Sequence, residues 1–303
     1  MGYHTSEAVK KRNPAPRRQS HKTYFTIPVM CLIAFAYRIH PSWPMIMISN
    51  RDEFHERPTA AARHWPENPE IYGGRDLREG GTWLGLHQSG RFAAVTNYRE
   101  PGSPAAAQSR GKLVTDYLTS SSPTRNHLEL LRLQQRQYGG FNLLAGDDKD
   151  LFYISNRCKQ AGYPLKPGFY SLSNHLLNSP WPKVQKAKQI IESQVKAYGE
   201  SLQLQSSNSF VAMTEMGENL IKGFRDEQQA PDGELPDTGV GFQIEKMLSS
   251  IFIKTPGYGT RCSTFFAKHV SGKSLITEMS YQPDGEISGR IQSQLTPDNW
   301  TSN

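Results

Sequence analysis

The sequence predicts an α+β fold in which two stacked β-sheets are flanked by helices. Apolar runs of strand length fill much of the first half of the 303 residues and return near the C-terminus. Amphipathic segments of helical length come in pairs between these runs. Strand-rich blocks separated by helix pairs suit two sheets packed face to face with helices outside them. The periodicity alone does not distinguish this arrangement from another α+β sandwich.

Two buried strands open the pattern. Residues 31–39 and 45–50 are almost continuous apolar runs, which is typical of strands that are buried on both faces. Pro41 and Pro44 lie between the two runs and predict a turn. We therefore expect the two strands to lie side by side in one sheet.

Hairpins and helices follow along the chain. Residues 83–86 and 91–96 predict a hairpin, because turn-forming residues separate two strand-like runs. The same argument predicts a hairpin from residues 141–145 and 151–154. Amphipathic spacing predicts helices over residues 110–119, 124–137, 182–198 and 209–222. The remaining predicted strands are residues 169–172, 251–254, 264–269 and 275–279.

The composition argues for a soluble protein without a disulfide framework. Apolar residues make up 36% of the chain, and the mean hydropathy is −0.62. No run approaches the roughly 20 apolar residues of a membrane span, so we expect no stable membrane insertion. Cys31, Cys158 and Cys262 are an odd number of cysteines, and no secretory signal precedes them. A reducing compartment suits this pattern, and we expect a cytoplasmic protein.

The net charge of +7 is concentrated at the N-terminus. Residues 1–30 hold six basic residues and one acidic residue, which leaves +2 for the rest of the chain. The near balance of residues 31–303 gives no reason to expect nucleic acid as a partner. We interpret residues 1–30 as a disordered basic extension and residues 31–303 as a single domain. Two alternatives stay open, namely translation from Met30 and, in a eukaryote, a mitochondrial targeting segment.

The segment Asn50-Arg51-Asp52-Glu53 is the most informative part of the chain. It follows the apolar run of residues 45–49, and Cys31 opens the preceding predicted strand. Neighbouring strands would put the Cys31 thiol beside a guanidinium and a carboxylate, which suits a nucleophile. From the spacing alone, a buried cysteine next to a surface salt bridge explains the pattern as well.

A series of blocks in the chain resembles a known family. The blocks that carry the resemblance are Asn50-Arg51-Asp52-Glu53-Phe54, Gly73-Gly74-Arg75-Asp76-Leu77, Gly80-Gly81-Thr82-Trp83-Leu84-Gly85, Gly140-Phe141-Asn142-Leu143-Leu144, Leu172-Ser173-Asn174, Pro180-Trp181-Pro182-Lys183-Val184 and Tyr258-Gly259-Thr260-Arg261-Cys262. They resemble, in order, the blocks of the NRDE family, also called the transport and Golgi organization protein 2 family. The resemblance runs from Cys31 to about residue 270. Two of these blocks contain a glycine pair, and we predict that Gly73-Gly74 and Gly80-Gly81 permit tight turns.

The resemblance implies a fold and a chemistry. The family is similar to N-terminal-nucleophile (Ntn) hydrolases, which have a four-layer αββα sandwich of two antiparallel sheets. It implies that Cys31 becomes the nucleophile once the residues before it are removed, and that its own α-amine is the base. The resemblance further implies site roles for Arg51, Asp52, Asn97, Asn174 and Arg261. In these roles the asparagines hold an oxyanion or the amine, and the arginines and Asp52 set the charge around the thiol, which nearby cations favour as thiolate.

Two functions stay open from the resemblance. The first is hydrolysis of a non-peptide C–N (amide) bond in a small-molecule substrate, without a cofactor or metal. The second is a non-catalytic binding or trafficking protein on the same scaffold, with haem or a lipid-related ligand, because family members have been implicated in haem trafficking and lipid homeostasis. Hydrolysis requires a free amine on Cys31, whereas binding does not. The sequence gives neither the substrate nor the oligomeric state.

Overall fold

The computed structural model describes residues 1–2, 30–104, 106–159, 162–202 and 207–301. The interpretation of the N-terminal segment as a disordered extension falls on residues 3–29, which lie outside the described residues. The first strand begins at Met30, one residue before the predicted start.

The first of two sheets is antiparallel and has six strands in the order β10-β1-β2-β11-β12-β13. Its strands are β1 (Met30–Tyr37), β2 (Met45–Phe54), β10 (Gly168–Leu172), β11 (Tyr258–Lys268), β12 (Ser274–Tyr281) and β13 (Ile287–Leu295). The two apolar runs at the start of the domain, β1 and β2, are neighbours as predicted. Segments from both ends of the domain therefore build one sheet.

The second sheet is also antiparallel and has seven strands in sequence order from β3 to β9. Its strands are β3 (Thr59–Trp65), β4 (Asn68–Asp76), β5 (Leu84–His87), β6 (Phe92–Asn97), β7 (Phe141–Gly146), β8 (Leu151–Ser155) and β9 (Tyr163–Pro164). Both predicted hairpins, β5–β6 and β7–β8, belong to this sheet.

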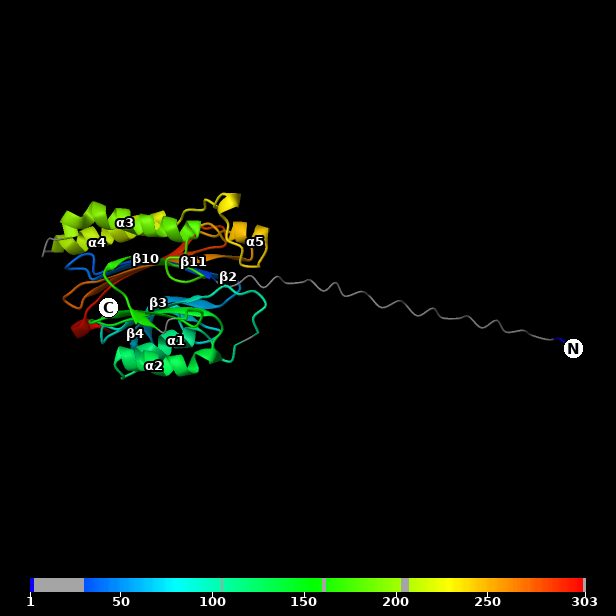
Figure 1. Ribbon diagram of the computed structural model, residues 1–303, viewed down its shortest axis with the longest axis horizontal. Helices are drawn as coiled ribbons and strands as arrows, with labels where there is room; N and C mark the ends of the chain where they lie inside the picture. Colours follow the sequence, from blue (N-terminus) through cyan, green and yellow to red (C-terminus); the bar gives the residue numbers. More distant parts are fainter. Residues whose placement is uncertain (3–29, 105, 160–161, 203–206, 302–303) are drawn as a thin grey trace.

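Helices cover the outer face of each sheet (Figure 1). The helices α3 (Pro182–Leu202) and α4 (Ser207–Gly223) lie on the first sheet, and α1 (Gly111–Thr119) and α2 (Thr124–Gln134) lie on the second. A short helix, α5 (Phe242–Met247), lies near one end of the first sheet. The four-layer αββα sandwich is thus confirmed. Within the described residues, no helix is long and apolar enough to cross a bilayer.

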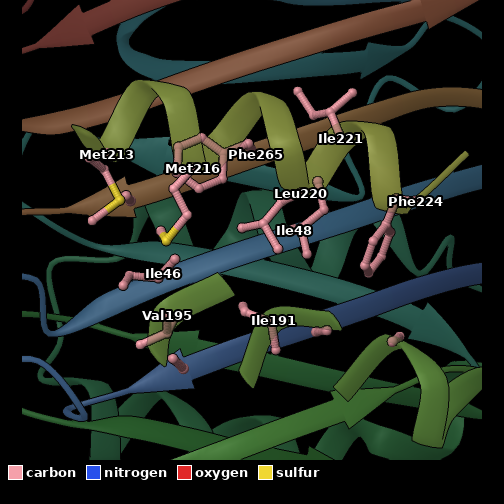
Figure 2. Packing of buried hydrophobic residues seen from close by; sticks show 14 of the residues in the cluster. Ile46, Ile48, Ile191, Val195, Met213, Met216, Leu220, Ile221, Phe224 and Phe265 are labelled. Atoms are coloured by element: carbon pink, nitrogen blue, oxygen red, sulfur yellow. The ribbon is translucent and has the colours of Figure 1, made fainter. Parts of the chain in front are cut away.

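Alternation along the strands divides the core into layers. In β1, Leu32, Ala34 and Ala36 pack toward α3 and α4, whereas Ile33 and Phe35 pack between the sheets. Figure 2 shows the outer layer, in which Ile46 and Ile48 of β2 meet apolar side chains of α3 and α4. Because side chains alternate along a strand, each position in β1 and β2 has an assigned face. This alternation orients the candidate site.

Three sequence predictions differ from the structure. Residues 251–253 are buried, but residues 251–254 form no strand. Phe252 and Ile253 bond to Asp226 and Thr260, and Lys254 makes an isolated bridge to Gly259. Gly73 and Gly74 lie inside β4 rather than in a turn, where a Cβ on Gly73 would meet the Leu84 carbonyl at 2.7 Å. The strands β3, β4 and β13 were not predicted, since they lack a continuous apolar run.

Candidate functional site

The Cys31 thiol lies between the two sheets. Cys31 is the second residue of β1 and pairs with Arg51 of β2 across the ladder. Both residues occupy the alternating positions that face the second sheet, and Cys31 is only 8% exposed. The sequence prediction that neighbouring strands bring the cysteine beside the arginine is therefore confirmed.

Arg51 is held on several sides. Its guanidinium stacks over the Trp83 ring at 4.3 Å from the ring centre. One nitrogen donates to Thr59 Oγ1 at 3.1 Å, and another lies 3.6 Å from the Glu53 carboxylate. Glu53 in turn lies 3.5 Å from Arg57. The cation beside the thiol is thus fixed in place by groups from both sheets.

Asp52 faces the opposite way, toward the helical layer. Its Oδ1 accepts a hydrogen bond of 2.7 Å from Thr260 Oγ1, and the residue is fully buried. Its Oδ2 is also buried and accepts no hydrogen bond from any residue that the structure describes. Met30 lies directly opposite Asp52 in the β1–β2 register, so the peptide bond between Met30 and Cys31 runs alongside the strand residue that carries this carboxylate. A buried carboxylate oxygen of this kind calls for a donor.

Burial dominates the protonation of the thiol. It raises the pKa of Cys31 to about 12, and the nearby Asp52 carboxylate adds to this effect. Arg51 lowers the pKa, but by less than burial raises it. In the chain in which residues still precede Cys31, burial therefore outweighs the flanking cation, although Arg51 by itself favours the thiolate. A separate proton acceptor is needed to activate this thiol.

A chain of hydrogen bonds ties Asn174 to β1 at Cys31. The Ser173 hydroxyl lies 3.0 Å from both the Cys31 carbonyl oxygen and Asn174 Oδ1. The Asn174 amide nitrogen donates to the backbone oxygen of Asn97 at 3.0 Å. Asn97 is the last residue of β6, in the other sheet. The two predicted asparagines therefore contact each other where the sheets meet beside Cys31.

Arg261 sits on a β-bulge. The pairing of β11 with β2 shifts between Thr260 and Cys262, so Arg261 is an inserted residue. Bulges bend a strand and redirect a side chain, and they are common next to functional sites. One Arg261 nitrogen donates to the backbone oxygens of Phe54 and Arg57, at 2.9 and 3.1 Å. Arg261 thus braces the turn after β2, and its charge interacts with Arg51 and Cys262.

Sequence reasoning missed a group of charged residues behind Asp52. Lys183, the second residue of α3, is 4% exposed and donates to the Leu248 oxygen at 2.9 Å. Arg99 and Glu245 form a buried ion pair next to it, and the Arg99 guanidinium lies 4.7 Å from the Trp181 ring centre. The block Pro180-Trp181-Pro182-Lys183 was the available signal, since it places a lysine between buried apolar residues.

One small cavity of about 10 Å³ adjoins the charged group behind Asp52, and a much larger one lies elsewhere. A cavity of about 690 Å³, lined in part by Tyr37, Met45 and Lys268, lies at the end of β1 opposite Cys31. Among the described residues, no group of three or more His, Cys, Asp or Glu side chains is arranged to hold a metal ion. All three cysteines are free thiols. Cys262 of β11 lies opposite Arg51 in the β2–β11 ladder, on the side of β2 away from β1.

Comparisons with known proteins agree with the order of the motifs. A family model described as Transport and Golgi organisation 2 matches residues 30–283. The human Transport and Golgi organization protein 2 homolog is 35% identical over 266 residues, which cover 83% of this chain and 93% of that protein. The Drosophila melanogaster Transport and Golgi organization protein 2 is 32% identical, over 77% of this chain and 85% of that protein.

Similar solved structures include the Caenorhabditis elegans N-acylethanolamine-hydrolyzing acid amidase ortholog, with 11% sequence identity and a TM-score of 0.32. The match covers 61% of this chain and 85% of that chain.

Proposed function

This chain belongs to the Transport and Golgi organisation 2 family, and on that premise we propose that it is an Ntn hydrolase of a small-molecule amide with Cys31 as its nucleophile. One observation carries the proposal. The buried Asp52 Oδ2 lacks a donor among the described residues, and Asp52 lies across the ladder from the peptide bond that precedes Cys31. When Cys31 is the first residue, the nitrogen of that bond is an α-amine, which we assign as the donor to Asp52.

The α-amine supplies the proton acceptor that the thiol needs. An α-amino group has a pKa of about 7.7–8.0, so its neutral form is present near neutral pH. The amine takes the thiol proton as sulfur attacks the amide carbonyl. The C–N bond then breaks, the leaving amine takes that proton, and a thioester remains on Cys31. Water hydrolyses the thioester and releases the acid.

The surroundings of Cys31 support this reaction. Arg51 is fixed by Trp83, Thr59 and Glu53, so its positive charge stays beside the reacting sulfur. Asn174 and Asn97 are assigned to the oxyanion or the amine, and Asn174 is one residue from the serine that binds the Cys31 carbonyl. An amide donor aimed at a developing oxyanion contributes roughly 3 kcal/mol. Arg261 acts through the turn after β2.

The residues before Cys31 must be removed for this chemistry. A peptide nitrogen, unlike an amine, does not accept a proton at neutral pH. A chain that begins at Met30 would lose this methionine before the small Cys31 side chain. We therefore propose that the chain beginning at Cys31 is the active form and that the full-length chain is inactive.

The test compares the two forms of the protein. The chain beginning at Cys31 should release a burst of chromophore from chromogenic amides, approaching one equivalent per chain, and the full-length chain should release none. Cys31→Ala in the short chain should abolish release and keep the circular-dichroism spectrum. Cys31→Ser should stay folded and react much more slowly, since a hydroxyl is a weaker nucleophile at neutral pH.

Equal turnover by the full-length chain would contradict the proposal, provided that its mass stays unchanged during the assay. Release that persists in Cys31→Ala would do the same, because it would place the nucleophile elsewhere. Intact mass measurement before and after the assay separates slow processing from true activity of the long form.

A further inference from the structure

Lys183 is buried without a close ion-pair partner among the described residues. It follows Trp181 and Pro182 at the start of α3, where the helix packs on β1 and β10. Its ammonium group donates to the Leu248 oxygen, and the side chain is 4% exposed. A lysine is almost never this deeply buried unless a charge balances it.

The charged groups around Lys183 come from four other elements. They are Asp52 on β2, Cys31 on β1, Glu245 on α5 and Arg99 in the segment after β6. Arg99 and Glu245 neutralise each other in a buried ion pair, and Glu245 also accepts from Thr238. On its own helix, Lys186 pairs instead with Asp226. Asp52 is therefore the anion left to balance Lys183.

A free α-amine on Cys31 would add a second cation to this buried place. One carboxylate balances one ammonium group, and a second ammonium would leave an uncompensated buried charge, which is strongly unfavourable. Of the two amines near Asp52, Lys183 and the α-amine of Cys31, only one is therefore protonated at a time. Burial lowers the pKa of Lys183, while Asp52 opposes that shift. For Asp52, burial raises the pKa and Lys183 is the first of the groups that lower it.

We infer that Lys183 is a positioning residue for the nucleophile, whose ammonium group balances Asp52 and thereby leaves the α-amine of Cys31 neutral. The inference rests on the proposed Ntn function, because it concerns the amine that this function requires. Lys183 exchanges no proton with the substrate. In the reaction, the thiol proton still moves to the α-amine. The amine can accept it because it is neutral, since the Lys183 ammonium group already balances the Asp52 carboxylate.

The titration of the amine itself tests this inference. Chains that begin at residue 31 and carry Cys31→Ala have an α-amine but no competing thiol. Trace acetylation with acetic anhydride across pH 5–10, read by mass spectrometry of the N-terminal peptide, gives the pKa of that amine. The variants are Lys183→Met, Lys183→Arg and, as the matched control on the same helix, Lys186→Met.

Lys183→Met should raise the pKa of the α-amine by at least about one pH unit, because Asp52 then has only the amine to balance it. At a fixed pH below that pKa, acetylation should slow about tenfold. Lys183→Arg and Lys186→Met should leave the titration unchanged. Equal titration of wild type and Lys183→Met would overturn the inference, and so would a shift in Lys183→Arg as large as in Lys183→Met.

A second pair of variants serves if Lys183→Met fails to fold. Asp52→Asn and the double variant Asp52→Asn/Lys183→Met contain no unpaired buried carboxylate. Because the inference makes Lys183 act through Asp52, the α-amine should titrate alike in these two proteins. A difference of about one pH unit or more between Asp52→Asn and the double variant would overturn the inference.

An activity measurement separates the inference from the proposed function. In chains that retain Cys31, Lys183→Met should move the acid limb of kcat/KM to higher pH, with the same shift as the amine titration. If wild type hydrolyses no amide, the proposed function fails, while the amine titration still decides the role of Lys183. If wild type is active and the acid limb does not move, the function stands and the inference fails.

Discussion

Cys31 reaches two different environments at once. Its thiol lies between the sheets beside Arg51, while Asp52, the next residue of β2, faces the helical side. This division follows from strand alternation, because neighbouring positions of β2 face opposite ways. Under the proposed function, one residue would therefore combine a sulfur beside a cation with an amine beside a carboxylate.

The three thiols should react in an order set by burial. In the folded full-length chain, Cys158 should be alkylated fastest, since Cys31 and Cys262 are buried and burial raises the pKa of both. In the chain that begins at Cys31, the labelling of Cys31 should speed up relative to Cys262. Timed iodoacetamide labelling with peptide mass spectrometry measures all three rates. Equal rates for Cys31 in both chains would argue against activation by the amine.

Asn174→Ala should lower turnover of the short chain by about a hundredfold or more, because the assigned oxyanion donor is lost. The same change removes the hydrogen bond that joins Asn174 to Asn97. Steady-state kinetics on a chromogenic amide measure the effect. Asn219→Ala is the matched control, since its amide binds Tyr198 on the outer helices. Similar losses in both variants would show a general loss of folding.

The residue pairs along β1 and β2 could be predicted from sequence, whereas the residues that pack on the helical side of these strands, such as Lys183, could not. Continuous apolar runs identify two adjacent buried strands, and their register then puts Cys31 opposite Arg51. Lys183 has no such pattern. Its burial depends on α5 and the segment that carries Leu248, which are distant in sequence. Sequence spacing therefore predicts contacts within a ladder better than contacts between layers.

Among the elements, the amphipathic helices were predicted more closely than the edge strands. The predicted helix 182–198 agrees with α3 apart from its last turn, because its apolar stripe is long and regular. In contrast, β13 lies at the edge of the first sheet and is mostly exposed, so it has no apolar run to detect. The bulge at Arg261 was also invisible, since it is a property of the pairing.

Glycines in the two outer helices should respond in opposite ways to alanine. Gly217 of α4 lies over the first sheet, where a Cβ would meet the Phe265 ring at 2.5 Å. Gly217→Ala should therefore lower the free energy of unfolding by about 1–3 kcal/mol. Gly199 of α3 has nothing within 4 Å of its Cβ position, so Gly199→Ala should raise it by up to about 1 kcal/mol.

Urea denaturation followed by circular dichroism measures both changes. Figure 2 shows the layer concerned, in which Phe265 lies among Met213, Met216 and Leu220. Stabilisation by Gly217→Ala would mean that α4 can move away from the sheet without loss. Destabilisation by Gly199→Ala would contradict the assignment of open space at that position.

For the molecule as a whole, the part of the hydrophobic core that the structure describes is built from residues after Met30. The core clusters run from Leu32 to Trp300. Deletion of residues 1–29 should therefore change the melting temperature by no more than a degree or two. Differential scanning fluorimetry of the full-length and shortened chains checks this. A fall of many degrees would show that the N-terminal segment contributes to the packed domain.

Stability should decrease as the pH falls below about 6.5. Burial lowers the pKa of six histidines, namely His40, His55, His87, His127, His175 and His269. The unfolded chain then binds more protons than the folded chain just below the ordinary histidine pKa of 6.5, so acid favours unfolding. Burial raises the pKa of Asp52 and Glu278, which opposes this trend, but these carboxyls are only two.

Urea midpoints at pH 7.5, 6.5 and 5.5 measure this dependence. The urea midpoint should be lower at pH 5.5 than at pH 6.5. His127→Gln should make this decrease smaller, because it removes one of the six histidines with a lowered pKa. A midpoint that rises on acidification would show that the two carboxyls outweigh the histidines.

Arg51 separates two sulfurs that would otherwise be neighbours. Cys31 and Cys262 flank it on β1 and β11, so their Cα atoms lie two strand spacings apart, about 9–10 Å. A disulfide needs Cα atoms within about 7 Å. Oxidants therefore cannot join Cys31 to Cys262 unless the backbone moves. Oxidation of the Cys31 thiol to a sulfenic acid needs no second cysteine, and a small thiol can reverse that first stage.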